Sequence, residues 1–451
     1  MKSEKRIYID WQFSFCMILV ILGILNINRV FEFSLINNIF YIISKVLLGI
    51  SAFFIFVNPL KAVLILPLTS ICIAEFQILN YRILYIDILY IFLLFYIFIN
   101  RIKKSYLKIE TPLFLKISSF ILIVFVLTAL QEYYRSFGNI KIYLILIKYI
   151  EYFTYPFIIY YFFKNAQDNQ NMKCFFMFLL LAIYLIGFYG VISVKFYSRA
   201  TAPFEQIGEP NTIGGMMLVF ICIIFFYLLN FKNKIYQNIF LIFLLIQSIY
   251  VLFKTYSRTS YIAFSIMILV TAYYLKNNFV RFVLFIGIII LTVNKIPDDV
   301  IFRINTIYQG NNYYVFNLPI IGDLSFNTVS SAAARLNKYL FIINEVFPYI
   351  KFFGRGIEGI GFVDGFIFKI IGETGLIGLI FFIMTIRYIF YELNRKECMT
   401  KKVRCIVNVM IIGLLAHSLF VNTFIIYRII FPFYCFILLI IFSEKIKEII
   451  I

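Results

Sequence analysis

Uninterrupted apolar runs constrain this sequence more than any other feature. The run at 211–230, NTIGGMMLVFICIIFFYLLN, carries no Asp, Glu, Lys or Arg, and a helix of about 20 such residues spans the hydrocarbon core of a bilayer. Similar runs recur along the chain, which is 63% hydrophobic and only 14% charged. Because a soluble globular domain is roughly half apolar and a quarter charged, the sequence predicts a polytopic α-helical membrane protein.

We predict about fourteen transmembrane helices in one integral membrane domain that covers residues 1–451. The expected fold class is therefore all-α. The predicted spans are 11–27, 36–57, 62–80, 83–99, 113–131, 140–163, 174–194, 211–230, 235–254, 259–275, 281–293, 365–390, 403–421 and 425–442.

The basic residues indicate how these spans are oriented. Cytoplasmic loops carry an excess of Lys and Arg, and with fourteen spans all the basic segments fall on one side, together with both termini. We therefore assign the net charge of +19 to cytoplasmic loops and expect no nucleic-acid partner. The basic segments are 1–10, 101–108, 164–173, 232–234, 276–281, 394–404 and 443–448.

One large loop, residues 294–364, remains on the outer side. Its segment 330–350, SSAAARLNKYLFIINEVFPYI, predicts an amphipathic helix that Ser330 or Ser331 caps and Pro348 helps to end. We expect this helix to lie on the membrane domain through four apolar residues at helical spacing. They are Leu336, Leu340, Ile343 and Phe347.

Arginine does not follow the cytoplasmic bias. Several arginines map to the outer side or to the outer ends of spans. Arg presents a planar, always-charged fork that binds phosphate through two hydrogen bonds, whereas Lys is a point charge. Arginines that converge at headgroup level suit a diphosphate, and local pairing with nearby carboxylates is the alternative for some of them. The outer arginines are Arg29, Arg82, Arg135, Arg199, Arg258, Arg303, Arg335, Arg355 and Arg428.

Four motifs in the second half of the chain carry a resemblance to a known family. They are RATAPFEQIGEPNTIGG from residue 199, YSRTSY from 256, RLNKYLFIINEVFPYIKFFGRGIEGIG from 335 and DGFIFKIIGETGLIGLIFF from 364. Their order, with the long outer loop before the last motif, resembles the O-antigen polymerase/ligase superfamily of Wzy- and WaaL-type membrane glycosyltransferases. The resemblance covers roughly residues 195–390.

The resemblance implies a GT-C-like glycosyltransferase in the bacterial cytoplasmic (inner) membrane. Its active site faces the extracytoplasmic side, and its donor is a glycan linked to undecaprenyl diphosphate. The family's diphosphate-binding arginines correspond to Arg199, Arg258, Arg335 and Arg355. Family ligases carry a functional His near the end of the outer loop, where this chain has Asp364, and the only His is His417 in a late span. We therefore favour a polymerase of repeat units for O-antigen or capsule.

The reaction requires a base for the acceptor hydroxyl and cations for the departing diphosphate. Asp364, which heads a span, is the first candidate base, followed by Glu209 and Glu358. Metal-dependent enzymes of this architecture place acidic pairs in the first outer loop, where this chain has Glu32 alone. We therefore expect no metal and no cofactor.

Three motifs in or near the large outer loop have simpler interpretations. GRGIEG at 354–359 fits a nucleotide-binding pattern, but its glycines are more typical of a loop that bends near the membrane surface. Gly372, Gly375 and Gly378 predict a smooth helix face for close packing. Lys369 and Glu373 predict a buried ion pair, and a lone His in an apolar helix, such as His417, is more typical of a hydrogen-bonded core residue.

Other functions remain open at this point. A ligase would transfer the finished glycan to a lipid A core, and a flippase or exporter of lipid-linked glycans has a similar length and composition. An ion-coupled transporter needs acidic residues inside the membrane, and Glu75, Asp87 and Glu151 are available. For a polymerase, a chain-length regulator is a candidate partner.

Overall fold

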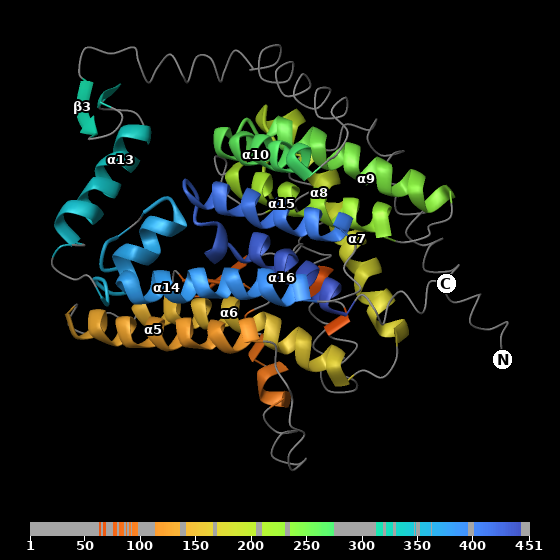
Figure 1. The fold of residues 1–451 in the computed structure, drawn as a ribbon, viewed down its shortest axis with the longest axis horizontal. Helices are drawn as coiled ribbons and strands as arrows, with labels where there is room; N and C mark the ends of the chain where they lie inside the picture. The colour runs from red at the N-terminus through yellow and green to blue at the C-terminus, as the bar shows by residue number, and fades with distance from the viewer. Residues whose placement is uncertain are drawn as a thin grey trace.

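A computed structural model of the chain describes a helical bundle with two short hairpins (Figure 1). The described residues are 63–64, 66–68, 75–78, 81–84, 87, 90–91, 93–97, 113–135, 141–165, 169–203, 210–230, 235–274, 313–318, 322–327, 331–346, 348, 352–361, 363–395 and 401–442. The predicted spans 11–27, 36–57 and 281–293 lie outside these residues.

The long helices of the described part follow the apolar runs. They are α5 (Leu113–Arg135), α6 (Lys141–Asn165), α7 (Asn169–Tyr197), α8 (Pro210–Asn230), α9 (Ile235–Lys254), α10 (Arg258–Tyr274), α14 (Phe366–Arg395), α15 (Lys401–Ser418) and α16 (Tyr427–Ile441). Five of the described helices contain stretches long and apolar enough to cross a bilayer. These stretches are Ile142–Phe162, Cys174–Tyr197, Pro210–Leu229, Ile235–Lys254 and Phe366–Leu393. The protein is therefore a helical membrane protein, and the count of fourteen spans stays a prediction.

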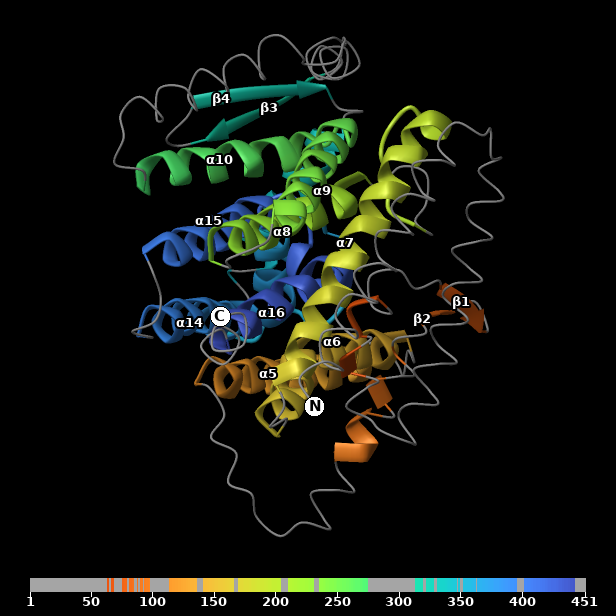
Figure 2. The same ribbon diagram turned by 90° about the vertical axis from the view of Figure 1, so that its right-hand side faces the viewer.

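Helix α16 lies at the centre of the bundle (Figure 2). It packs against α6 on one side and against α8 on the other, and nearly all of its apolar side chains are buried. Helices α5, α6 and α14 form one group, and α8, α9, α10 and α15 form a second. The short 3-10 turn η2 (Thr423–Ile425) joins α15 to α16 and lies between the two groups.

The spans predicted for 62–80 and 83–99 are partly wrong. Residues on both sides of their junction form an antiparallel hairpin, β1 (Glu75–Ile78) with β2 (Tyr81–Leu84). Its polar residues Gln77 and Arg82 are cross-strand partners. In the hairpin, the backbone N–H and C=O groups pair across the two strands. Two helices that end here would leave the groups at their ends without such partners.

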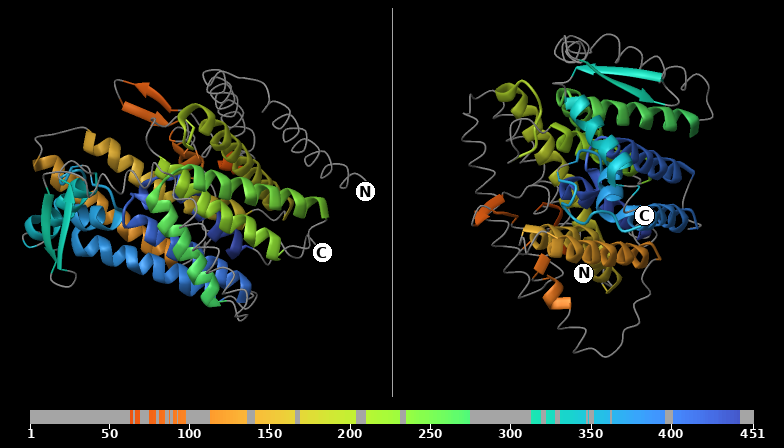
Figure 3. Two further views of the ribbon diagram at one scale, coloured as in Figure 1. Left: turned by 90° about the horizontal axis from the view of Figure 1, so that it is seen from above. Right: turned by 90° about the vertical axis from the view of Figure 1, so that its left-hand side faces the viewer.

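The outer loop contains a second hairpin and the expected amphipathic helix. Strands β3 (Tyr313–Leu318) and β4 (Gly322–Asn327) pair antiparallel at the periphery of the bundle (Figure 3). Helix α13 (Ser331–Phe341) continues into a π-helical turn, η1 (Ile342–Val346). The loop therefore contains ordered elements between α10 and α14.

The buried face predicted for this helix is wrong by about one residue. Ile343 is 48% exposed, whereas Tyr339, Ile342 and Val346 are buried. Tyr339, an aromatic residue with a polar hydroxyl, occupies the buried face in place of the aliphatic residues expected there. Its ring stacks on Phe368, with the ring centroids 3.9 Å apart, and Ile342 and Val346 follow on the same face.

Candidate functional site

The turn after α7 holds Arg199 against the turn between α9 and α10. Ser198 ends α7 with a left-handed φ of 58°. The backbone N–H of Ala200 then donates to the carbonyl of Lys254 at 2.7 Å, and the N–H of Thr201 donates to Ser193 Oγ at 3.1 Å. Ala200 and Thr201 are buried. Arg199 therefore lies beside the end of α9 at Lys254, and Lys254 stands four residues before Arg258 in the chain.

Arg428 ties the same turn to the central helix. Its Nη1 donates to the carbonyl of Pro203, and the side chain is only 1% exposed. A buried cation requires polar partners, and this one connects the start of α16 with the chain that leaves α7. Sequence reasoning grouped Arg428 with the other outer arginines, and the structure gives it a role in packing.

The turn between α9 and α10 is built by hydroxyl side chains. Thr255 Oγ1 donates to the carbonyl of Leu252 at 2.7 Å and accepts the N–H of Ser257 at 3.1 Å. Ser257 precedes the first residue of α10, and its Oγ accepts the N–H of Ser260 at 3.2 Å. A serine at this position with a bond to the third helical residue is a preferred N-cap. The motif YSRTSY therefore places Arg258 at the first position of α10.

A chain of buried hydrogen bonds runs beneath Arg258. Ser260 Oγ donates to Ser257 Oγ at 2.9 Å, and Ser257 Oγ donates to Asn211 Oδ1 at 2.6 Å. In the other direction, His417 Nε2 lies 3.4 Å from Ser260 Oγ, and His417 Nδ1 lies 2.8 Å from Thr423 Oγ1. These five residues, the serine–histidine chain, connect α8, α10, α15 and η2. His417 is fully buried with both ring nitrogens bonded, which confirms the core interpretation.

Arg335 and Asp364 form an ion pair at the N-terminal end of α14. Arg335 Nε donates to Asp364 Oδ2 at 2.7 Å, and both side chains are 29% exposed. Tyr339, on the same helix as Arg335, donates its hydroxyl to the carbonyl of Leu419 at 3.3 Å. Burial raises the pKa of Tyr339 to about 12, so the phenol stays protonated and remains a donor.

The segment between α15 and η2 joins this ion pair to the serine–histidine chain. Asn422 Nδ2 donates to the carbonyl of Val363 at 2.7 Å, and the N–H of Phe366 donates to the carbonyl of Val421 at 3.2 Å. Asp364 therefore sits in a backbone that is fixed to residues next to Thr423. The structure brings Arg199, Arg258, Arg335 and Asp364 to one end of the bundle through these backbone contacts.

Helix α14 is broken at Gly375, where the outer loop docks on it. Gly375 has a φ of 66°, outside the helical region. The N–H of Arg355 donates to the carbonyl of Gly372 at 2.8 Å, and the N–H of Gly356 donates to the carbonyl of Glu373 at 3.0 Å. We call this contact of residues 352–361 with the break the loop clasp. The smooth helix face predicted here is wrong, because Gly375 allows the turn and the loop's backbone approaches it directly.

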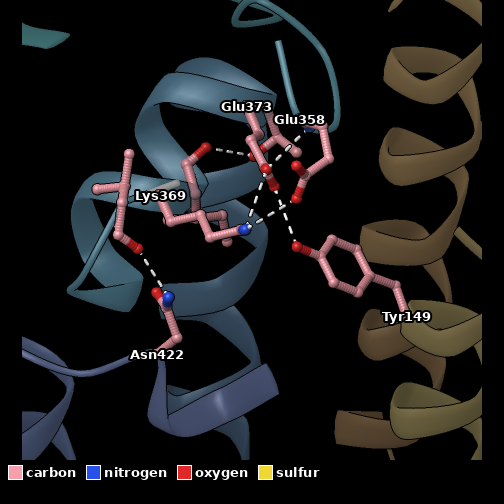
Figure 4. A network of polar contacts seen from close by, with 8 residues as sticks. Tyr149, Glu358, Lys369, Glu373 and Asn422 are labelled. Carbon is pink, nitrogen blue, oxygen red and sulfur yellow. Dashed lines mark hydrogen bonds and ion pairs between the residues drawn. The ribbon is translucent and has the colours of Figure 1, made fainter. Parts of the chain in front are cut away.

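An ion network fixes the loop clasp from inside (Figure 4). Lys369 Nζ lies 3.6 Å from Glu358 Oε1 and 3.4 Å from Glu373 Oε1. Glu373 Oε1 also accepts the N–H of Glu358 at 3.0 Å, and its Oε2 accepts the hydroxyl of Tyr149 at 3.3 Å. Glu373 is 1% exposed and Lys369 is 6% exposed, so the predicted ion pair is confirmed. Glu358, a candidate base, is engaged with Lys369.

Arg355 lies on the exposed face of the loop clasp. Its side chain is exposed, and its carbonyl accepts Arg135 Nη1 from the last turn of α5 at 3.3 Å. Gly356 and Gly359 pack so closely on Glu132 that an added Cβ would lie 2.6 Å and 2.8 Å from it. The contacts of Arg355 are therefore with α5 and α14. None of these contacts connects it to the turn between α9 and α10.

Glu209, a candidate base, and Glu151, an acid within a predicted span, do not join these contacts in the described residues. Glu209 lies outside the described residues. Among the intramembrane acids, Glu151 is 1% exposed and accepts the hydroxyl of Tyr155 at 2.8 Å. Asn211, which the sequence analysis does not single out, lies in the first turn of α8 and accepts from Ser257.

No protein-family model matches this chain, and no curated protein matches it.

Proposed function

We propose that this protein is a glycosyltransferase that polymerises undecaprenyl-diphosphate-linked repeat units into surface polysaccharide. The observation that carries the proposal is the hydrogen bond between the N–H of Ala200 and the carbonyl of Lys254, at 2.7 Å. This bond connects the turn of Arg199 with the turn that begins α10 at Arg258. In our proposal, these two arginines of separate motifs bind one diphosphate donor.

Transfer breaks the bond between the sugar C1 and the diphosphate oxygen and forms a bond from C1 to the acceptor hydroxyl oxygen. Negative charge develops on the departing diphosphate, and pre-placed guanidinium groups stabilise it. Arg199 and Arg258 take this role in our proposal. Neither step requires a metal or a cofactor.

Asp364 is the proposed base for the acceptor hydroxyl. It is partly exposed, and its carboxylate is oriented by Arg335 Nε at 2.7 Å. The bonds from Asn422 and Phe366 to the neighbouring backbone hold it in place. Glu358 is less suited to the role, because Lys369 and the loop clasp engage it. Position and orientation contribute as much as basicity to a general base.

Deletion of the gene, followed by analysis of the surface glycan and of the lipid-linked pool, tests the proposal. A polymerase deletion leaves a single repeat unit on the cell surface. A core with no repeat unit would instead identify a ligase, and repeat units trapped at the cytoplasmic face would identify a flippase. An unchanged glycan would exclude all three and leave an ion-coupled transporter as the class to test.

A further inference from the structure

The hydrogen bonds of the serine–histidine chain have a fixed direction. Ser257 Oγ accepts both the N–H and the hydroxyl of Ser260, at 3.2 and 2.9 Å. A serine hydroxyl has two acceptor lone pairs and one proton, so the proton of Ser257 goes to Asn211. The distance of 2.6 Å to Asn211 Oδ1 is typical of O–H···O and short for N–H···O.

The same argument fixes the ring of His417. Ser260 has already given its proton to Ser257, so it accepts the proton on His417 Nε2. A fully buried imidazole without an anionic partner is neutral, and its Nδ1 therefore accepts the hydroxyl of Thr423 at 2.8 Å. The carbonyl of Val421 lies farther from the same hydroxyl oxygen, at 3.3 Å. Every donor in the chain points from η2 toward Asn211.

Asn211 is the end of the serine–histidine chain that reaches toward the surface. The other four members, Ser257, Ser260, His417 and Thr423, are at most 3% exposed, whereas Asn211 is partly exposed. Because Asn211 Oδ1 accepts from Ser257, its Nδ2 amide group is directed away from that hydroxyl. Asn211 and Ser257 also stand at the N-termini of α8 and α10, where helix dipoles favour anionic ligands.

We propose that Asn211 is a further substrate-binding residue, whose Nδ2 donates to a phosphoryl oxygen of the lipid-linked diphosphate beside Arg258. His417 is the positioning residue that orients it, through Ser260 and Ser257. This inference rests on the proposed function and adds a residue to the same site.

The test measures the affinity of the purified full chain for undecaprenyl diphosphate, together with its thermal unfolding midpoint. Asn211→Ala removes the donor and should weaken binding roughly 10-fold or more, as expected for a hydrogen bond to a charged group. Asn211→Asp keeps the acceptor for Ser257 but presents an anion to the phosphate. It should therefore bind more weakly than Asn211→Ala while unfolding at the same temperature or higher.

Asn408→Asp is the matched control. Asn408 Nδ2 donates to the hydroxyl of Tyr274 at 2.7 Å, in the part of α15 far from His417. The affinity of the Asn408→Asp variant for undecaprenyl diphosphate should equal that of the wild type. For His417, replacement by Leu should weaken binding several-fold, and Gln, which keeps a donor toward Ser260, should restore part of it.

Each outcome decides between the ideas. If the wild type does not bind undecaprenyl diphosphate, the proposed function and this inference both fail. If the wild type binds and Asn211→Asp binds at least as well as Asn211→Ala, Asn211 is only structural and this inference alone fails. If Asn211→Asp does not fold, undiminished affinity of Asn211→Ala overturns it. Wild-type affinity in His417→Leu overturns the positioning role.

Discussion

Asn422 Nδ2 donates to the carbonyl oxygen of Val363 at 2.7 Å, and so joins the end of the outer loop to the segment that follows α15. Val363 precedes the candidate base Asp364, and Asn422 precedes Thr423 of the serine–histidine chain. One side-chain amide therefore connects the two halves of the proposed site, which the chain separates by 59 residues.

Replacing Asn422 with Ala should lower the free energy of unfolding by about 1 kcal/mol, the usual contribution of one hydrogen bond. Glycan transfer should fall more than stability does, because the backbone next to Asp364 loses the hydrogen bond from Asn422 to Val363. Thermal unfolding and transfer assays on the same preparation measure both. Asn408→Ala, which loses the bond to Tyr274, should lose similar stability and keep its activity. Equal activity loss in both variants would contradict the role of Asn422.

Gly375→Ala should destabilise the protein by about 1–3 kcal/mol, the cost of a strained backbone position. The φ of 66° disfavours a side chain, and a Cβ there would lie 2.5 Å from the carbonyl oxygen of Phe352. The loop clasp must then shift. Thermal unfolding checks this, with Ile380→Ala as the control, because Ile380 is 52% exposed on the same helix. A stable Gly375→Ala variant would mean that α14 is straight at this point.

The break at Gly375 also illustrates what the sequence can predict. Helices α6, α8 and α9 lie within two residues of the spans predicted at 140–163, 211–230 and 235–254, because apolarity along the chain is a local signal. The break depends instead on a loop about 20 residues earlier that supplies N–H groups to Gly372 and Glu373. No local pattern distinguishes this geometry from a glycine-lined helix face.

The candidate site divides in the same way. Arg258 and Asp364 were predicted from motifs, because residue type and position at the outer ends of spans are visible in the sequence. The pairing of Arg335 with Asp364, 29 residues apart, was not predicted, and the contact of Asn211 with Ser257 spans 46 residues. The two serines of YSRTSY, at 257 and 260, were the available signal for an N-cap.

Lys369→Met should destabilise the protein by about 3–5 kcal/mol, because it leaves Glu373 buried without its cation. Adding Glu373→Gln in the double variant should restore more than half of that loss, since the buried charge is then absent. The comparison of the two unfolding midpoints tests the ion network. Lys401→Met, at an exposed position in α15, should change little. A double variant no more stable than Lys369→Met would argue against a buried pair.

Arg199→Lys and Arg258→Lys should each lower kcat/KM for the lipid-linked donor at least about tenfold, because Lys retains the charge and loses the forked contact with the diphosphate. Stability should change little. The matched control is Arg387→Lys, an exposed position in the later part of α14. Full activity of both site variants would remove these arginines from the proposed diphosphate site.

Exchanging the charges of Arg335 and Asp364 separates pairing from chemistry. Each single reversal places like charges together where the native pair is 2.7 Å apart, and should cost about 1 kcal/mol because both side chains are partly exposed. The double variant Arg335→Asp with Asp364→Arg restores the attraction and should recover the unfolding midpoint. It should remain inactive, because the carboxylate now lies on α13 instead of at the start of α14. If the double variant transfers glycan at the wild-type rate, the position of Asp364 is irrelevant to the reaction and its assignment as base is wrong.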